Sequence, residues 1–244
     1  MNDILKTQLA FDYCCTPEDV SDDKNIFTVY SPHTDRRKFN EAEDCFLKIT
    51  AINGKLLFTG RDDIIDLCRE KYTHADGAWF MEPRNIIELD GIIRKFGFKI
   101  TELHPFYISE KITQPACDFE TVYYGQREIE QFRGDDRFKE AFAFSPEAPD
   151  VIGIAAVKNG IIMGMAGASA DSPLMYQIGI NVLPEYSGKG IGTALVTLLK
   201  NKVLKLGKLP FYGTAISHIA SRKTAFNAGF FPAWTELSTK GEDK

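Results

Sequence analysis

Apolar residues follow a two-residue or a 3.6-residue period along most of this chain, and each period predicts a type of element. Apolar runs at 46–52 and 55–58 flank Asn53-Gly54. That pair readily supplies the positive φ angles of a two-residue turn, so a β-hairpin is predicted. Residues 1–40 are polar and show no clear period, and we predict no element there.

Two helices and an extended segment are predicted after this hairpin. Apolar residues recur at helical spacing over 62–72 and 85–96, and Gly97 is placed to end the second helix. Residues 98–108 then have the pattern of an extended segment.

An aperiodic stretch around Pro115 predicts a boundary between two domains. We place it near Ile112, between an N-terminal α+β domain, 1–112, and a second domain, 113–244. A length of 244 residues allows each part its own core.

The second half is dense in strand patterns. Residues 151–157 and 161–168 are apolar almost throughout, which is typical of strands buried on both faces, and Lys158-Asn159-Gly160 predicts a hairpin between them. The other predicted elements are helical segments at 126–132 and 135–142, a strand at 175–182, a strand at 210–216, a helix at 219–228 and a strand at 230–237.

One long helix is predicted between 175–182 and 210–216. Its apolar residues recur at helical spacing, and we assign four lysines to the opposite, solvated face. The apolar members are Ile191, Ala194, Leu195, Leu198, Leu199, Val203 and Leu206, and the lysines are Lys200, Lys202, Lys205 and Lys208.

Composition limits the partners. The net charge is −5 and the pI is near 5.5, with no basic stripe that would hold a nucleic-acid backbone. The first residues lack a targeting pattern, and the longest apolar run, 161–170, is too short to cross a bilayer. The five cysteines show no C-x-x-C spacing. We expect a cytoplasmic monomer or homodimer that acts on a small molecule. We expect it to contain no metal and to bind neither nucleic acid nor membranes.

Gly188, Gly190 and Gly192 lie at alternate positions directly before the long helix. The first amides of a helix lack partners within the helix, point outward and carry the positive end of its dipole. Glycines also remove the Cβ atoms that would hold a phosphate group away. This arrangement predicts an anion site.

Two common phosphate-binding loops do not fit this segment. A P-loop ends in Gly-Lys-Ser/Thr, whereas Lys189 here precedes Gly190. A dinucleotide fingerprint needs a third glycine where Thr193 stands, and an acidic residue in the next strand, 210–216, which has none.

The segment resembles the loop of the GNAT superfamily of acyl-CoA-dependent N-acyltransferases, R/Q-x-x-G-x-G/A, with Gly190 and Gly192 as its glycines. The stretch from Ser217 through Ala228-Gly229-Phe230 is similar to the family's last helix. The resemblance covers about 121–237. It implies an α+β / α/β fold with a GNAT-like mixed, mostly antiparallel central sheet flanked by helices.

The resemblance also implies acetyl-CoA as the acyl donor. The loop amides would bind its pyrophosphate, and the strand 176–182 would diverge from its neighbour and offer backbone groups to the pantetheine. Ser221 could bond coenzyme A or its own helix. The implied binding set is Ile178, Ile180, Val182, Ser187, Gly188, Lys189, Gly190, Ile191, Gly192, Thr193 and Ser221.

Two positions depart from the family pattern. Ser187 stands where the family usually has Arg or Gln, which removes a charge from the phosphate site. Ala225 stands where many members have a tyrosine that protonates the leaving thiolate. An acid, if one is used, must come from elsewhere.

Acyl transfer from a thioester to an amine needs a neutral amine, a stabilised oxyanion and a proton for sulfur. Asp171 is a candidate base, and it could equally cap the turn that it begins. Gln177 lies in an apolar strand, so it either satisfies a backbone group or faces substrate. Tyr212 and His218 are candidate acids, although Tyr212 could be a core residue and His218 could simply cap a helix or face water.

The sequence leaves two functions open. The first is an N-acetyltransferase that moves an acetyl group from acetyl-CoA to a primary amine of a small molecule, by direct attack in a ternary complex. The second is a coenzyme A-binding sensor or structural module with weak or no catalysis. The N-terminal half is either a degenerate GNAT-like copy that walls the acceptor pocket or a domain whose Gly97-Phe98 echoes Gly229-Phe230 by chance.

Overall fold

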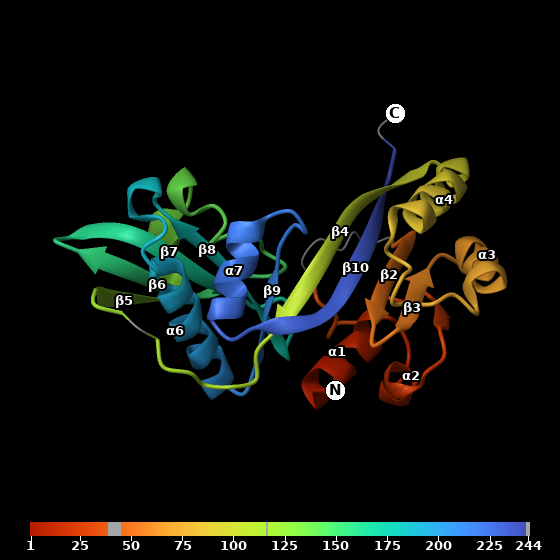
Figure 1. Ribbon diagram of the computed structural model, residues 1–244, viewed down its shortest axis with the longest axis horizontal. Helices are drawn as coiled ribbons and strands as arrows, with labels where there is room; N and C mark the ends of the chain where they lie inside the picture. The colour runs from red at the N-terminus through yellow and green to blue at the C-terminus, as the bar shows by residue number, and fades with distance from the viewer. Residues whose placement is uncertain (39–44, 116, 243–244) are drawn as a thin grey trace. The chain divides into compact units, whose positions relative to one another are not determined.

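A computed structural model describes residues 1–38, 45–115 and 117–242, which form two compact units (Figure 1). Unit 1 contains the described residues of 1–36, 45–106 and 233–242, and unit 2 contains those of 37–38 and 107–232. The last described residues therefore belong with the first unit. The proposed independent domains at 1–112 and 113–244 stay a prediction.

Unit 1 is a mixed sheet with helices. Its strand order is β1-β3-β2-β10-β4, with β1 parallel to β3 and with β2 antiparallel to both β3 and β10. The elements are α1 (Asp3–Asp12), α2 (Pro17–Ser21), β1 (Ile26–Val29), β2 (Leu47–Ile52), β3 (Lys55–Gly60), α3 (Asp62–Tyr72), α4 (Pro83–Ile93), η1 (Arg94–Phe96), β4 (Phe98–Ile108) and β10 (Phe231–Gly241).

The turn and helix ends predicted for unit 1 are confirmed. Asn53 and Gly54 both have positive φ, 49° and 81°, as the β2–β3 hairpin requires. Helix α4 begins at Pro83, slightly earlier than expected, because proline is favoured in the first turn of a helix. Gly97 follows η1 in the left-handed conformation with φ 78°.

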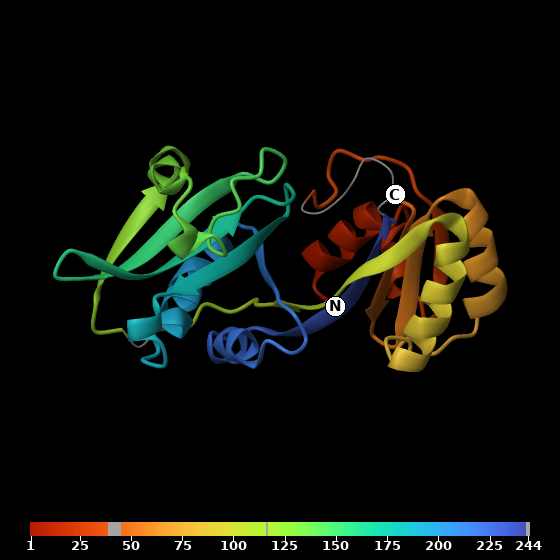
Figure 2. The ribbon, with the colours of Figure 1, turned by 90° about the horizontal axis from the view of Figure 1, so that it is seen from above.

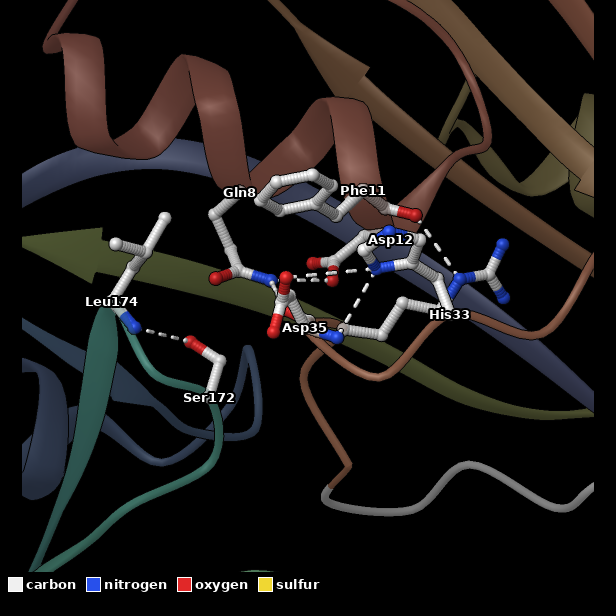
Figure 3. Close-up of polar contacts among 8 residues, drawn as sticks. Gln8, Phe11, Asp12, His33, Asp35, Ser172 and Leu174 are labelled. Carbon is white, nitrogen blue, oxygen red and sulfur yellow. Dashed lines mark hydrogen bonds and ion pairs between the residues drawn. The ribbon is translucent and has the colours of Figure 1, made fainter.

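Helix α1 was not predicted, because polar residues interrupt its buried face. Gln8 is fully buried on that face, and its Nε2 donates to Asp12 Oδ1 and to the Asp35 carbonyl, both at 2.9 Å (Figure 3). The Phe11 ring stacks on His33 with centroids 4.8 Å apart. Polar groups that pair with one another can be buried like apolar ones, and this hides the helical period.

Unit 2 carries the sheet order β9-β8-β7-β6-β5, which is antiparallel except for the β8–β9 pair. This confirms the mixed, mostly antiparallel sheet of a GNAT-like fold. The elements are β5 (Glu120–Gly125), α5 (Gln126–Ile129), η2 (Glu130–Phe132), η3 (Asp136–Phe138), β6 (Asp150–Lys158), β7 (Ile161–Ser169), β8 (Met175–Val182), η4 (Pro184–Tyr186), α6 (Ile191–Lys205), β9 (Leu209–Gly213) and α7 (Ile219–Asn227).

Both faces of the unit 2 sheet are covered (Figure 2). On one face, Ile154 and Ala166 pack with side chains of α6 and α7, such as Leu195 and Ala225. On the other, Ala155 and Met165 belong to a second cluster, with Phe132, Phe138 and Phe142. Alternate residues of each strand thus face opposite layers, which explains the nearly continuous apolar sequences.

Three predictions for unit 2 are wrong in detail. The predicted helix at 135–142 contains only the short turn η3, and the predicted strand at 210–216 ends at Gly213. Strand β5 was not predicted, because half-exposed residues make its apolar pattern weak. Lys200 does not face solvent: it is fully buried, and its Nζ donates to the Lys111 carbonyl and to Thr113 Oγ1.

No helix among the described residues has the length and apolar content needed to cross a bilayer. The five cysteines are free thiols, and Cys68 is buried. Within the same residues, no cluster of three or more His, Cys, Asp or Glu side chains has the arrangement of a metal site.

Candidate functional site

The glycine segment lies between η4 and α6 in unit 2. Gly188 and Gly190 have φ angles of 75° and 79°, in the left-handed region that favours glycine. A Cβ atom at either position would meet no other atom within 4 Å, so open space surrounds this backbone. Gly190 is the N-cap residue of α6.

The first turn of α6 has no internal partner for its amides. No side chain caps it, and no acidic residue lies in its first turn. Within the described part of the chain, none of the backbone amides of residues 188–193 donates a hydrogen bond to another group. These amides and the helix dipole together favour an anion at this point.

Gly192 has a packing role instead. A Cβ atom there would lie 3.3 Å from Val182 Cγ2 and 3.7 Å from Thr224 Cγ2. The glycine lets the start of α6 approach β8 and α7 closely. Ile191, beside it, is buried in the core, and Thr193 is half-buried on the first turn.

Strand β8 diverges from β9 beside this loop. The two pair in parallel only at Met175–Leu209, Tyr176–Pro210 and Gln177–Phe211. Strand β8 continues to Val182 and stays paired with β7 along that length. From residue 178 onward, its other edge is unpaired with β9, as the family resemblance implied.

The side chains of Ile178, Ile180 and Val182 face the core rather than solvent. Ile178 is 1% exposed, and the other two pack partly buried against the same cluster. A ligand between the separated ends of β8 and β9 would contact the backbone groups of these residues, because their side chains pack in the core.

Ser187 and Lys189 flank the first glycine and are exposed. The Ser187 amide donates to the Pro184 carbonyl at 3.1 Å. Lys189 Nζ donates to the Glu185 carbonyl at 2.9 Å and lies 5.4 Å from the Tyr186 ring centroid. Lys189 is thus the cation nearest in sequence to the loop, and its present contact is with exposed backbone.

Asp171 is buried next to the last β8–β9 pair. Its Oδ1 accepts from Ser169 Oγ at 2.6 Å, whereas its buried Oδ2 has no hydrogen-bond partner. Burial raises the pKa of Asp171 to about 7, against the lowering effects of Ser169, Arg37 and the Gln177 amide. The structure therefore brings Asp171 and Gln177 together through the Gln177 backbone.

The turn that Asp171 begins is held by its neighbour. Ser172 Oγ accepts from the Leu174 amide at 3.2 Å and from the Met175 amide at 2.9 Å (Figure 3). The Asp171 carbonyl also accepts from the Lys38 amide at 2.9 Å. These contacts fix the point at which β8 begins.

Tyr212 and Ser221, predicted separately, are hydrogen-bonded to each other. The Tyr212 hydroxyl lies 2.8 Å from Ser221 Oγ and joins β9 to the first turn of α7. Tyr212 is 2% exposed. Burial raises its pKa, the Ser221 hydroxyl opposes this, and the Glu140 carboxylate adds to it. Tyr212 thus keeps its proton at neutral pH.

His218 is exposed at the N-cap position of α7, where its side chain makes no cap hydrogen bond. Its Nδ1 lies 3.4 Å from Thr214 Oγ1. Ala225, where the family pattern has tyrosine, is fully buried in the core. Tyr212 and His218 are therefore held by different contacts, and the structure does not join them in one hydrogen-bonded pair.

Two residues of this region were missed. Asn181, on the diverging part of β8, accepts with Oδ1 from the amides of Glu140 and Ala141, both at 2.9 Å. Glu140 lies in a segment that was predicted as helix. An asparagine in an apolar strand was the available signal, and the same argument was applied only to Gln177.

Comparison with protein families agrees with this geometry. The sequence profile of the acetyltransferase (GNAT) family matches residues 116–230. A sequence search of the curated proteins found no match.

Solved structures with similar folds are remote in sequence. A GCN5-related N-acetyltransferase from Kribbella flavida is 16% identical, with a TM-score of 0.46 over 64% of this chain and 64% of that one. A GNAT-family acetyltransferase from Colwellia psychrerythraea is 15% identical, with a TM-score of 0.42 over 59% and 57%. Each of these two matches spans less than two thirds of either chain. A GCN5-related N-acetyltransferase-like protein from Streptococcus suis is 12% identical, with a TM-score of 0.45 over 82% and 86%.

Proposed function

We propose that this chain, which contains a GNAT acetyltransferase domain at residues 116–230, transfers an acetyl group from acetyl-CoA to a primary amine of a small molecule. One observation carries the proposal: the bare amides of residues 188–193 follow, after the short turn η4, a strand that diverges from its parallel neighbour. The amides suit a diphosphate, and the unpaired strand edge suits the amides of a pantetheine arm.

The residues of this segment fit coenzyme A by size as well as by charge. Gly188 and Gly190 present no Cβ atom to an approaching phosphate, and open space surrounds both. The first turn of α6 carries no carboxylate that would repel it. Acetyl-CoA would supply an activated thioester, whose carbonyl the amine attacks directly in a ternary complex.

The protein's own residues then have separate roles. Backbone amides on the unpaired edge of β8 stabilise the developing oxyanion. Tyr212, kept protonated by burial and bonded to Ser221, is the candidate to protonate the leaving sulfur, with His218 as the exposed alternative. The burial of Asp171 favours a positioning role before β8, where its Oδ1 accepts from Ser169 Oγ and its carbonyl accepts from the Lys38 amide.

Calorimetry with coenzyme A tests the binding site. Gly188→Ala and Gly190→Ala should each weaken binding about tenfold, because a Cβ enters the phosphate approach and the left-handed conformation becomes strained by about 1–2 kcal/mol. Gly207→Ala is the matched control: Gly207 also has positive φ, 72°, with open space, but lies just past the far end of α6. If all three variants bind alike, the amides of this loop are not the site.

Thiol release from acetyl-CoA, measured with a panel of primary amines, tests the reaction. Turnover that depends on the amine supports the transferase. Ser187 and Ala225 favour a second candidate, a coenzyme-binding sensor, because they remove a charge and a tyrosine from the family pattern. Tight coenzyme A binding with no thiol release for any amine would support the sensor instead.

A further inference from the structure

Three glycines form a row across the sheet of unit 2. The register pairs Gly153 of β6 with Gly167 of β7, and Gly167 with Gly179 of β8. Paired residues of adjacent strands point to the same face, so the row leaves a bare strip of backbone on that face.

The segment 140–142 fills this strip. A Cβ atom at Gly179 would lie 1.8 Å from the Glu140 carbonyl oxygen, and one at Gly167 would lie 1.9 Å from the Ala141 carbonyl oxygen. A Cβ at Gly153 would lie 2.9 Å from the Phe142 ring. The segment therefore runs across β6, β7 and β8 in contact with their backbones, and Glu140 is its residue on β8.

Hydrogen bonds fix Glu140 at this point. Asn181 Oδ1 accepts from the Glu140 amide and from the Ala141 amide, and Ala141 is buried. Gly179 and Asn181 both lie beyond Gln177, in the part of β8 that is unpaired with β9. The backbone of Glu140 is thus held over the diverging edge, while its side chain stays exposed.

The carboxylate of Glu140 also acts on the other side of the gap. Tyr212 follows Phe211, the last β9 residue paired with β8, and the Glu140 charge is one of the groups that raise the pKa of Tyr212. Glu140 lies over Gly179, two residues past Gln177, and Tyr212 is one residue past Phe211, so an exposed carboxylate and a buried phenol both belong to residues just beyond the last β8–β9 pair. An acceptor that reaches the gap would meet both.

We propose that Glu140 binds the amine of the acceptor and takes its proton during acetyl transfer, a role that rests on the proposed function. The bound ammonium ion first gives one proton to solvent through the Glu140 carboxylate, which leaves the neutral amine. As the C–N bond forms and the C–S bond breaks, a second N–H proton passes to the Glu140 carboxylate, and the thiolate takes the Tyr212 proton. Exchange with solvent then restores both groups. The acceptor class is a primary amine that arrives as an ammonium ion, to which an exposed carboxylate is complementary.

The test compares Glu140→Gln with Glu147→Gln. Glu147 is an exposed carboxylate in the segment between η3 and β6, and its side chain accepts from Ser145 Oγ at 2.9 Å. Benzylamine, tyramine and spermidine serve as probe amines, in the presence of coenzyme A for binding and of acetyl-CoA for turnover. Glu140→Gln should lower kcat/KM for the amine about 100-fold and weaken amine binding. Glu140→Asp should recover part of the loss, and Glu147→Gln should match wild type.

Coenzyme A binding distinguishes the failure of this proposal from the failure of the proposed function. A Glu140→Gln protein that binds coenzyme A like wild type but has lost the amine supports the proposal. It is overturned if Glu140→Gln keeps kcat/KM within threefold of wild type, if it weakens coenzyme A binding as much as amine binding, or if wild type binds coenzyme A but none of the amines. Loss of coenzyme A binding by wild type itself would remove the proposed function.

Discussion

The β3–α3 junction of unit 1 and the β8–α6 junction of unit 2 begin alike. Each follows an antiparallel hairpin, and in each the second strand of the hairpin also pairs in parallel with another strand, β1 or β9. The helix follows the strand after one residue in unit 1 and after eight in unit 2. The two junctions nevertheless differ in the charged residues at the start of the helix.

Carboxylates occupy the start of α3. Asp62 and Asp63 lie in its first turn, and Asp63 Oδ1 accepts from the Ile64 amide at 2.9 Å. Arg61 pairs with Asp63 through two hydrogen bonds of 2.7 and 2.8 Å. The positive end of this helix dipole is therefore already neutralised by the protein's own side chains.

Glycine also has a different purpose in each junction. A Cβ at Gly60 would lie 2.3 Å from the Phe46 carbonyl oxygen, so this glycine permits close approach of the strands. A Cβ at Gly188 or Gly190 would meet no atom within 4 Å, and both glycines adopt positive φ. The first turn of α6, unlike that of α3, lacks carboxylates and follows glycines that face open space, and these two features together favour an anion there.

The largest predicted effect compares Asp171, in the turn before β8, with Asp63, at the start of α3, because their pKa values move in opposite directions. Folded Asp171 holds its proton up to about pH 7, whereas the unfolded chain releases it near pH 3.8. The folded state binds more protons between these values, so stability should fall as the pH rises across them. Asp171→Asn should then exceed wild type by on the order of 2–4 kcal/mol at pH 8 and match it near pH 4.

Urea unfolding at pH 4.5, 6 and 8 measures this difference, with Asp63→Asn as the opposite case. Arg61 lowers the pKa of Asp63, so Asp63 stabilises the fold at neutral pH, and that contribution is lost as the pH falls through its folded value. A constant difference between Asp171→Asn and wild type across the pH range would contradict the raised pKa.

Placing a carboxylate in the first turn of α6 would make it resemble α3. Thr193→Asp should weaken coenzyme A binding about 5–30-fold, because a like charge near the phosphates costs about 1–2 kcal/mol. The same change should leave unfolding unaffected or stabilise the helix by about 0.3–1 kcal/mol. Thr193→Asn is the neutral control, and equal coenzyme A affinity in the two variants would argue against an anion site here.

Restoring the family's charge at Ser187 should act in the opposite sense. Ser187→Arg should tighten coenzyme A binding about 2–5-fold, a modest gain because the position is exposed and solvent screens the charge. The gain should shrink as salt is raised from 50 to 500 mM. Calorimetry at both salt concentrations checks this, with Ser187→Gln to separate hydrogen bonding from charge.

The smallest effect is expected in unit 1. Asp62→Asn with Asp63→Asn should reduce stability by about 0.5–1 kcal/mol through the lost helix-dipole contribution. Combined with Thr193→Asp, the pair should create no new coenzyme A site, because α3 still lacks an open glycine approach. Detectable binding by that triple variant would break the comparison between the junctions.

Local chemistry explains the elements that could be predicted. Asn-Gly is one of the few pairs that adopt positive φ at low cost, and both Asn53-Gly54 and Asn159-Gly160 do so. Each pair therefore predicted its hairpin correctly. Lys200 shows the opposite case. Its spacing placed it on a polar face, but tertiary contacts with Lys111 and Thr113 bury its amine. A helical period shows which residues lie on the same face of a helix, but not which other elements pack against that face.

The candidate site likewise contains parts that the sequence could predict and parts that it could not. The spacing of Gly188, Gly190 and Gly192 and the family resemblance could indicate the phosphate loop, because a helix start exposes its amides whatever surrounds it. The bond between Tyr212 and Ser221 could not be predicted, since it joins a strand to a helix. The position of Glu140 depended on strand register, which pairs three glycines far apart in sequence.

The sequence by itself determined the turns, most strands and helices of both units, and the loop that leaves the first amides of α6 unpaired, because each depends on a few consecutive residues. Only the tertiary structure decided that Asp171 is buried with a raised pKa, that Gln177 is the exact point after which β8 separates from β9, and that Glu140 lies over that edge. Burial and register are set by residues distant along the chain, so no local pattern contains them.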